Sequence, residues 1–271
     1  MAERETLRTM KAEDVPAAFQ LSAQAGWNQT EEDWRTLLEL APETCLAIEV
    51  DGQLAATTTL LCYGQRLAWI GMVLTRLEFQ RRGFAKKLFG EALKRADEME
   101  IETIKLDATK QGQPIYEQFG FGREEEIVRW SRQNSGTEPL PVVRSSPPVW
   151  RHLDANYFGA DRLLLLEHLA KRNPPAVHEQ SYLFSRPGRT NAYLGPCVSD
   201  NPDGARSVIS ACVEESLSSW YWDLFPSNHH AAIIARDLGF TPQRHLLRMA
   251  RGKELRENRN AIYAIAGFEL G

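Results

Sequence analysis

The stretch EFQRRGFAKKLFGEALKRADEM, Glu78–Met99, joins a basic turn that contains glycine to a long amphipathic run without proline. From Ala85 onward, apolar side chains recur with the helical period on one face: Leu88, Phe89, Ala92, Leu93, Ala96 and Met99. The pattern therefore predicts a helix that begins near Gly83 or Phe84.

The start of this helix is unusually basic for an acidic chain. Its cations are Arg81, Arg82, Lys86 and Lys87. The first turn of a helix has unpaired backbone N–H groups and the positive end of the helix dipole, so cations there are unfavourable unless an anion binds. Because Gly83 has no side chain to block the approach, the stretch predicts a site for a diphosphate.

The residues on either side alternate between strand and helix patterns. Strands are expected at 5–9, 45–50, 53–62, 67–74 and 101–109, and helices at 14–25, 30–40 and 114–119. Asp51-Gly52 predicts a hairpin between two of these strands, and residues 121–132 are expected to close this half as a strand or hairpin. Together these elements predict an α/β chain with a mixed sheet.

Composition excludes several classes of protein. The chain has 271 residues, a formal net charge of −4 and 43% hydrophobic residues, which argues for a folded core and against an extended nucleic-acid surface. The charged N-terminal stretch and the short aliphatic runs predict no secretory signal and no membrane span, so a cytoplasmic location is expected. The four cysteines have no metal-ligand spacing, and no metal is expected.

The basic turn does not fit the common nucleotide loops, because neither GxxxxGK[ST] nor GxGxxG is present. QRRGFA, residues 80–85, fits Gln/Arg-x-x-Gly-x-Gly/Ala and resembles the acetyl-coenzyme A loop of the GNAT superfamily of N-acetyltransferases. The resemblance implies a set of coenzyme-binding residues in this loop: Gln80, Arg81, Arg82, Gly83, Phe84, Ala85 and Lys86.

The surroundings of the loop resemble the same family over nearly all of residues 4–132. WIGMVL, residues 69–74, is similar to the strand that splays from its neighbour and pairs with pantetheine. The resemblance implies coenzyme contacts through the backbone of Met72, Val73 and Leu74. Tyr116 precedes Gly120-Phe121 by four residues, as in the family's closing signature. The resemblance implies that Tyr116 protonates the departing thiolate, and a purely structural ring is the alternative.

The acceptor side is less well defined by the sequence. The strand before the loop offers no carboxylate as general base, which leaves four acidic candidates: Glu31, Glu32, Asp33 and Asp107. The resemblance places the turn with Trp27 and Asn28 where relatives close over the acceptor. We therefore expect four substrate-binding residues: Trp27, Asn28, Asp33 and Asp107. Trp27 can instead anchor a turn, and Asp107 can instead cap one.

The second half of the sequence resembles the first. ARDLGF at 235–240 matches YEQFGF at 116–121, and the VVR at 142–144 matches the start of the first strand. Two tandem GNAT-like domains are expected at 1–132 and 140–271, joined by a linker at 133–139. Each is expected to have a mixed, mostly antiparallel sheet with a splayed central strand pair and flanking helices. The second copy lacks the loop and has Ala235 at the tyrosine position, so it is expected to bind no coenzyme.

The resemblance implies an acetyl-coenzyme A-dependent N-acetyltransferase that acts on a primary amine of a small molecule by direct attack. A non-catalytic acyl-coenzyme A-binding or regulatory module is the alternative, because the general base is unassigned. Neither nucleic acid nor a membrane is an expected partner. We expect the second half to line a cleft that contains Trp27, with a dimerisation domain in a homodimer as the alternative.

Overall fold

The computed structural model describes residues 3–133, 149–214 and 218–271. The expected linker at 133–139, apart from Gln133, and the VVR at 142–144 lie outside these residues. Within the described ranges, no helix is long and apolar enough to cross a membrane.

The elements of the first half lie where the sequence pattern predicts them. They are β1 (Glu5–Thr9), η1 (Ala12–Asp14), α1 (Val15–Gln24), α2 (Glu31–Leu40), β2 (Cys45–Val50), β3 (Gln53–Tyr63), β4 (Leu67–Thr75), η2 (Leu77–Phe79), α3 (Phe84–Glu98), β5 (Thr103–Ala108), α4 (Gln113–Gln118) and β6 (Gly122–Arg132). Helix α2 begins with a capping box. Thr30 Oγ1 accepts a hydrogen bond from Asp33 N at 3.2 Å, and the Asp33 carboxylate accepts one from Thr30 N at 2.8 Å.

The second half adds two helices before its strands begin. Its elements are α5 (Val149–Phe158), α6 (Leu163–Arg172), β7 (Ala176–His178), β8 (Ser181–Arg186), β9 (Ala192–Ser199), α7 (Pro202–Glu214), β10 (Trp220–Leu224), α8 (His229–Asp237), β11 (Thr241–Gly252) and β12 (Ile262–Ala264). From β8 to β11 the order of strands and helices repeats that of β3 to β6.

In the described residues, the strands form one mixed sheet in the order β1-β2-β3-β4-β5-β11-β6-β10-β9-β8-β7, and β12 pairs with β9. β4 and β5 are parallel, but they pair only at Ala68↔Ile104 and Trp69↔Lys105 and then diverge. β9 and β10 form the corresponding parallel pair in the second half. The predicted splayed central pair is therefore confirmed in both halves, and most other pairings are antiparallel.

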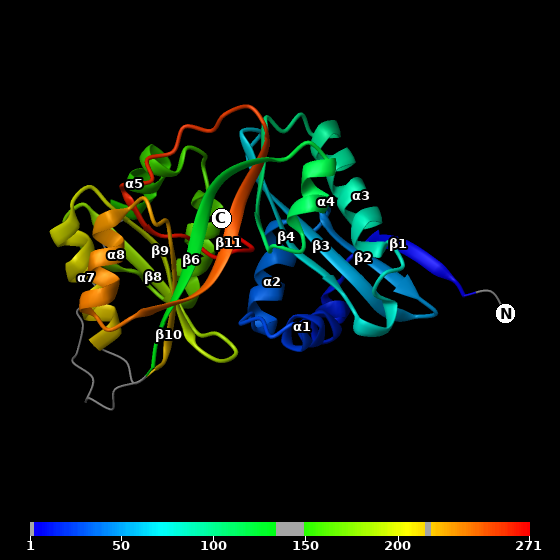
Figure 1. Ribbon diagram of the computed structural model, residues 1–271, viewed down its shortest axis with the longest axis horizontal. Helices are drawn as coiled ribbons and strands as arrows, with labels where there is room; N and C mark the ends of the chain where they lie inside the picture. Colours follow the sequence, from blue (N-terminus) through cyan, green and yellow to red (C-terminus); the bar gives the residue numbers. More distant parts are fainter. Residues whose placement is uncertain (1–2, 134–148, 215–217) are drawn as a thin grey trace.

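The two halves exchange their last long strands. β11 of the second half lies between β5 and β6, and β6 of the first half pairs with β10. Figure 1 shows β6 and β11 running together through the middle of the molecule. Strand pairing therefore crosses the boundary expected at 132–140, and the two expected sheets are joined into one.

Matching buried ion pairs hold the exchanged strands. Both carboxylate oxygens of Asp107 on β5 accept hydrogen bonds from Arg248 on β11, at 2.9 and 3.0 Å. Asp223 on β10 accepts two from Arg129 on β6, at 2.7 and 2.6 Å. Each aspartate is the second-last residue of the second strand in a splayed pair, so the same bidentate contact occurs once in each half.

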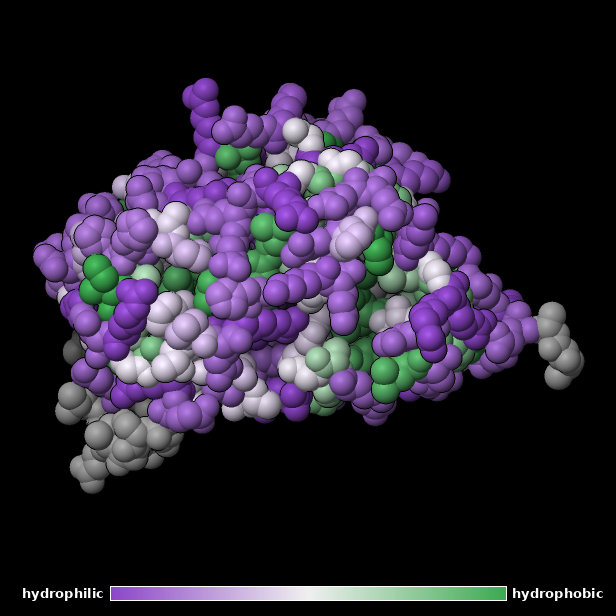
Figure 2. Space-filling model, viewed as in Figure 1, coloured by the Kyte–Doolittle hydropathy of each residue, from purple (hydrophilic) through white to green (hydrophobic). Residues whose placement is uncertain are grey.

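A shared core also joins the halves. One apolar cluster contains Trp34 and Trp69 of the first half together with Tyr182, Phe184 and Ile265 of the second. α1 and α2 cover this face of the first half, while α3 covers the opposite face. Figure 2 shows that hydrophilic residues cover most of the visible surface, with hydrophobic residues exposed mainly in hollows between them. Burial across the boundary means that each half would expose part of its core without the other.

Candidate active site

The basic turn leads into helix α3 with open space at its start. Gly83 is the N-cap residue with φ +83°, and a Cβ atom built on it meets no atom within 4 Å. A glycine cap has no side chain to accept hydrogen bonds from the first-turn N–H groups. The helix start therefore offers backbone donors to an external anion, which fits the predicted diphosphate site.

The side chains at residues 80–86 differ in how far contacts within the protein already occupy them. Arg82 pairs with Glu3 and lies over the rings of Phe79 and Phe84, at 5.3 and 5.0 Å. Phe84 is buried, so only its backbone is available to a ligand. Among the described residues, no ion pair involves Arg81 or Lys86, and both are exposed. Gln80 donates to Thr75 O at 3.3 Å.

β4 has a bulge beyond the residues where it pairs with β5. Thr57 pairs with Leu74 and Thr59 with Gly71, so Thr58 alone faces the two residues Met72 and Val73. Met72 has φ +49°, and its carbonyl accepts a hydrogen bond from Thr57 Oγ1 at 2.9 Å. The strand is therefore irregular at the residues expected to contact the coenzyme.

A cavity lies between the two halves beside this bulge, and we call it the central cavity. Its empty volume, including the open mouth, is about 690 Å³. The first half contributes Trp27, Gln29, Ile70, Gly71, Met72, Val73, Leu106, Asp107, Thr109, Tyr116 and Arg129, and the second contributes Arg244, Leu246, Phe268 and Glu269. The prediction that the second half lines a cleft containing Trp27 is confirmed. Leu74, Asn28 and Asp33 are not among the lining residues.

Tyr116 lies on α4 at the wall of the central cavity. Its ring packs against Phe89, with centroids 4.9 Å apart. A Cβ atom on Gly112 would lie 2.8 Å from that ring, so the glycine makes room for it. Burial raises the pKa of the Tyr116 hydroxyl to about 12. Tyr116 is therefore a protonated hydroxyl at neutral pH, as a proton donor must be.

Asp107 lines the cavity, as a substrate contact would, and it also has a structural partner in the second half. Both carboxylate oxygens are bound by Arg248, and both side chains are almost fully buried. A carboxylate held in this way serves to join β5 to β11.

Asn28, the second residue expected at the substrate, forms hydrogen bonds between the halves. Its Oδ1 accepts hydrogen bonds from Thr190 N, Thr190 Oγ1 and Asn191 N, at 2.9 to 3.1 Å. Its Nδ2 donates to Asn191 O at 2.8 Å. These bonds use the polar atoms of the side chain, so the turn after α1 is fixed on the second half.

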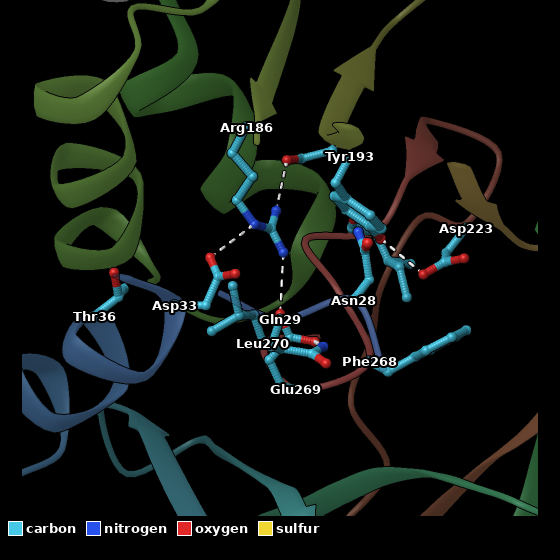
Figure 3. Close-up of polar contacts among 12 residues, drawn as sticks. Asn28, Gln29, Asp33, Thr36, Arg186, Tyr193, Asp223, Phe268, Glu269 and Leu270 are labelled. Atoms are coloured by element: carbon cyan, nitrogen blue, oxygen red, sulfur yellow. Dashed lines mark hydrogen bonds and ion pairs between the residues drawn. The ribbon is translucent and has the colours of Figure 1, made fainter. Parts of the chain in front are cut away.

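Asp33, also expected at the substrate, is not among the lining residues of the central cavity and lies in a buried charge cluster at the same boundary. Its Oδ1 is 3.4 Å from Arg186 Nε and 3.5 Å from Arg172 Nη1. Arg186 reaches Glu269 Oε1 with Nη2 at 3.1 Å, so Figure 3 shows its guanidinium between two carboxylates. Glu31 and Glu32, the other acidic candidates of α2, are not among the residues that line the central cavity either.

Glu269 is the carboxylate that sequence reasoning missed. It is 3% exposed and lines the central cavity, where Oε2 accepts a hydrogen bond from Gln29 Nε2 at 2.8 Å. Burial raises the pKa of its carboxyl, and Asp33 adds to the effect, while Arg186 and Gln29 oppose it. A carboxylate with a raised pKa in a cavity is suited to accept a proton. No sequence motif marks Glu269. It reaches the cavity by packing against Gly71, which lies about 200 residues earlier in the sequence.

The corresponding space in the second half is filled by the chain itself. Beyond the last parallel pair, Trp222↔Leu194, β12 pairs with β9, and Ile265 N donates to Asp223 O at 3.1 Å. Residues 262–265 therefore lie between the splayed strands, and Ala235 at the tyrosine position is fully buried.

In the described residues, no group of His, Cys, Asp and Glu side chains is arranged to hold a metal ion.

Comparisons with known proteins agree with this architecture. The model of the acetyltransferase (GNAT) family matches residues 10–121, and that of an acetyltransferase (GNAT) domain matches residues 150–264. The chain belongs to the GNAT acetyltransferases. It has two GNAT domains in tandem, as expected, and is an acetyltransferase enzyme; enzymes of this family use acetyl- or acyl-coenzyme A.

Similar proteins match most of the length of the chain. An uncharacterized N-acetyltransferase of Bacillus subtilis, YitH, is 25% identical over 256 residues, which covers 84% of this chain and 85% of that protein. A candidate acetyltransferase of Pyrococcus horikoshii has the same fold with a TM-score of 0.86 at 21% identity, covering 98% of this chain and 96% of that one. A GCN5-related N-acetyltransferase of Sphaerobacter thermophilus has a TM-score of 0.68 at 13% identity, with 94% and 96% covered.

Proposed function

We propose that the protein transfers an acetyl group from acetyl-coenzyme A to a primary amine of a small molecule bound in the central cavity. In this proposal, the α3 start binds the diphosphate, the splayed region between β4 and β5 takes the pantetheine arm, and the second half binds no coenzyme. The observation that carries the proposal is that Tyr116 and Glu269 line one cavity beside the β4 bulge.

The two residues have opposite tasks. An amine attacks a thioester only when it is neutral, so Glu269 takes a proton from the incoming ammonium group and releases it to solvent. The amine nitrogen then forms the C–N bond as the C–S bond breaks. Tyr116 gives its proton to the departing thiolate, and the proton lost by the new amide nitrogen returns to the Tyr116 oxygen. One proton is released in each turnover.

The β4 bulge supplies the third part of the chemistry. Because Met72 and Val73 face a single residue of β3, this backbone is not held in a regular ladder. An N–H group there can donate to the thioester carbonyl and stabilise the negative charge that develops on it. The side chain of Met72 is buried, so only its backbone has this task.

A matched pair of variants tests the proposal against a non-catalytic coenzyme-binding module. Thiol release from acetyl-coenzyme A is measured with a panel of primary amines. Tyr116→Phe is expected to lower kcat by roughly 10²-fold or more while coenzyme affinity is kept. Tyr157→Phe, on α5 outside the cavity, is the control. If the wild-type protein binds the coenzyme but releases no thiol with any amine, the binding module is correct.

Three further expectations accompany this proposal. The protein is expected to act in the cytoplasm, to need no metal and to bind neither nucleic acid nor membranes. A homodimer is also a prediction, and analytical ultracentrifugation measures the oligomeric state.

A further inference from the structure

Arg244 on β11 is a cation of the central cavity with unused hydrogen-bonding capacity. It is half-buried, and among the residues that the structure describes it has no hydrogen-bond, ion-pair or ring partner. Burial lowers the pKa of its guanidinium and the neighbouring Arg129 lowers it further, while the carboxylate of Asp223, which Arg129 binds, opposes them. Burying a cation without a partner is unfavourable, so this arrangement is suited to an anion that arrives from outside.

The other charges of the cavity wall are already balanced. Asp107 is neutralised by Arg248, and Arg129 by Asp223. Glu269 and Asp33 share Arg186, and Arg172 also approaches Asp33. Arg244 therefore gives the wall one uncompensated positive charge.

A second unused polar group lies at the same cavity. Gln29 donates its Nε2 hydrogen to Glu269, and its Oε1, which is buried, has no hydrogen-bond partner among the described residues. An amide oxygen of this kind accepts a hydrogen bond from an N–H donor. Gln29 and Glu269 together therefore form a pair of acceptors suited to an amine or ammonium group.

We infer that the acceptor, given the proposed acetyl transfer, is an amino acid or a similar amine with a carboxylate. Arg244 binds the carboxylate, while Gln29 and Glu269 bind the nitrogen. A carboxylate carries one negative charge, which matches the single uncompensated charge of the wall, whereas a phosphate carries nearly two. Trp27, Leu246 and Phe268 add apolar surface between the two polar ends.

Matched acceptors test this inference. Each amino acid is compared with its own carboxamide and with the aminophosphonate of the same shape, by kcat/KM for thiol release. The wild-type protein is expected to prefer the carboxylate over the amide by at least about tenfold, the scale of a hydrogen bond to a charged group. In Arg244→Gln this ratio is expected to fall to near one, and Arg244→Lys is expected to restore part of it. Arg251→Gln, which removes a charge elsewhere on β11, should keep the wild-type ratio.

A binding measurement separates this inference from the proposed function. Calorimetry with amino acids and coenzyme A, without an acetyl group, reports the carboxylate site even if no acetyl transfer occurs. Binding that Arg244→Gln abolishes supports the site whether or not the catalytic proposal holds. Three results would overturn the inference: equal use of acid and amide by the wild-type protein, a preference for the phosphonate, or weaker acetyl-coenzyme A binding in Arg244→Gln with an unchanged acid-to-amide ratio.

Discussion

Gly71 lies directly against the backbone of Glu269. A Cβ atom built on Gly71 would be 2.9 Å from Glu269 Cα and 3.1 Å from the Glu269 carbonyl oxygen. The splayed strand β4 therefore has no side chain at the place where residues 265–271 of the second half meet it. This contact brings Glu269 of one half to the β4 strand of the other, which we propose to bind the coenzyme.

Gly71→Ala is expected to displace Glu269 and lower kcat roughly tenfold to a hundredfold, because small displacements of reacting groups have large effects on rate. Acetyl-coenzyme A affinity should change little. Gly90→Ala, within α3, is the matched control, since a Cβ atom there meets nothing within 4 Å. Steady-state kinetics measures both variants, and equal kcat values for the two would show that the contact has no role in catalysis.

Gly83→Glu is expected to weaken acetyl-coenzyme A binding strongly, because it places bulk and negative charge at the helix start proposed to hold the diphosphate. Gly52→Glu controls for backbone strain, since Gly52 also has a positive φ and open space at its Cβ position. Isothermal calorimetry compares the two. The assignment fails if Gly83→Glu binds the coenzyme as tightly as Gly52→Glu does.

Arg248→Met is expected to lower the free energy of unfolding by about 3–5 kcal/mol, because it leaves the buried carboxylate of Asp107 without its partner. Adding Asp107→Leu should recover part of this loss. Asp237→Ala breaks the exposed pair with Arg206 and is expected to cost at most about 1 kcal/mol. Urea unfolding measures all three. A loss in Arg248→Met no larger than that in Asp237→Ala would mean that the ion pair does not help to hold the exchanged strands.

The local parts of the fold and site could be predicted from the sequence. The turn at 80–85, the capping box of Thr30 and the Asp51-Gly52 hairpin depend on neighbouring residues, so their patterns are visible in a short window. The spacing of Tyr116 to Gly120-Phe121, which carries its proposed role, is local in the same way.

The contacts between the halves could not be predicted, because they join residues far apart in the chain. Asn28 and Asp107 have residue types typical of a substrate site, but Asn191 and Arg248 of the second half bind their polar atoms. Glu269 has no local motif, and its position beside β4 depends on packing against Gly71. The exchange of β6 and β11 cannot be read from the sequence for the same reason. The hydrophobic pattern of the two strands is the same whether each pairs within its own half or with the other half.

The pH dependence of kcat in the wild-type protein and in Glu269→Gln tests the central claim most directly. At saturating amine, a general base must be deprotonated, so log kcat should rise with pH through the pKa of Glu269. Burial and Asp33 place that pKa above the usual value of 4.5 for glutamate. Because the pKa of Tyr116 is about 12, the acid stays protonated over this range. Glu269→Gln should lower kcat roughly 10²-fold or more and remove the acidic limb of the pH profile, which is the rise of log kcat with pH. Glu254→Gln changes an exposed residue and is the control, so its pH profile should keep the acidic limb. An unchanged kcat and an unchanged acidic limb in Glu269→Gln would contradict the account.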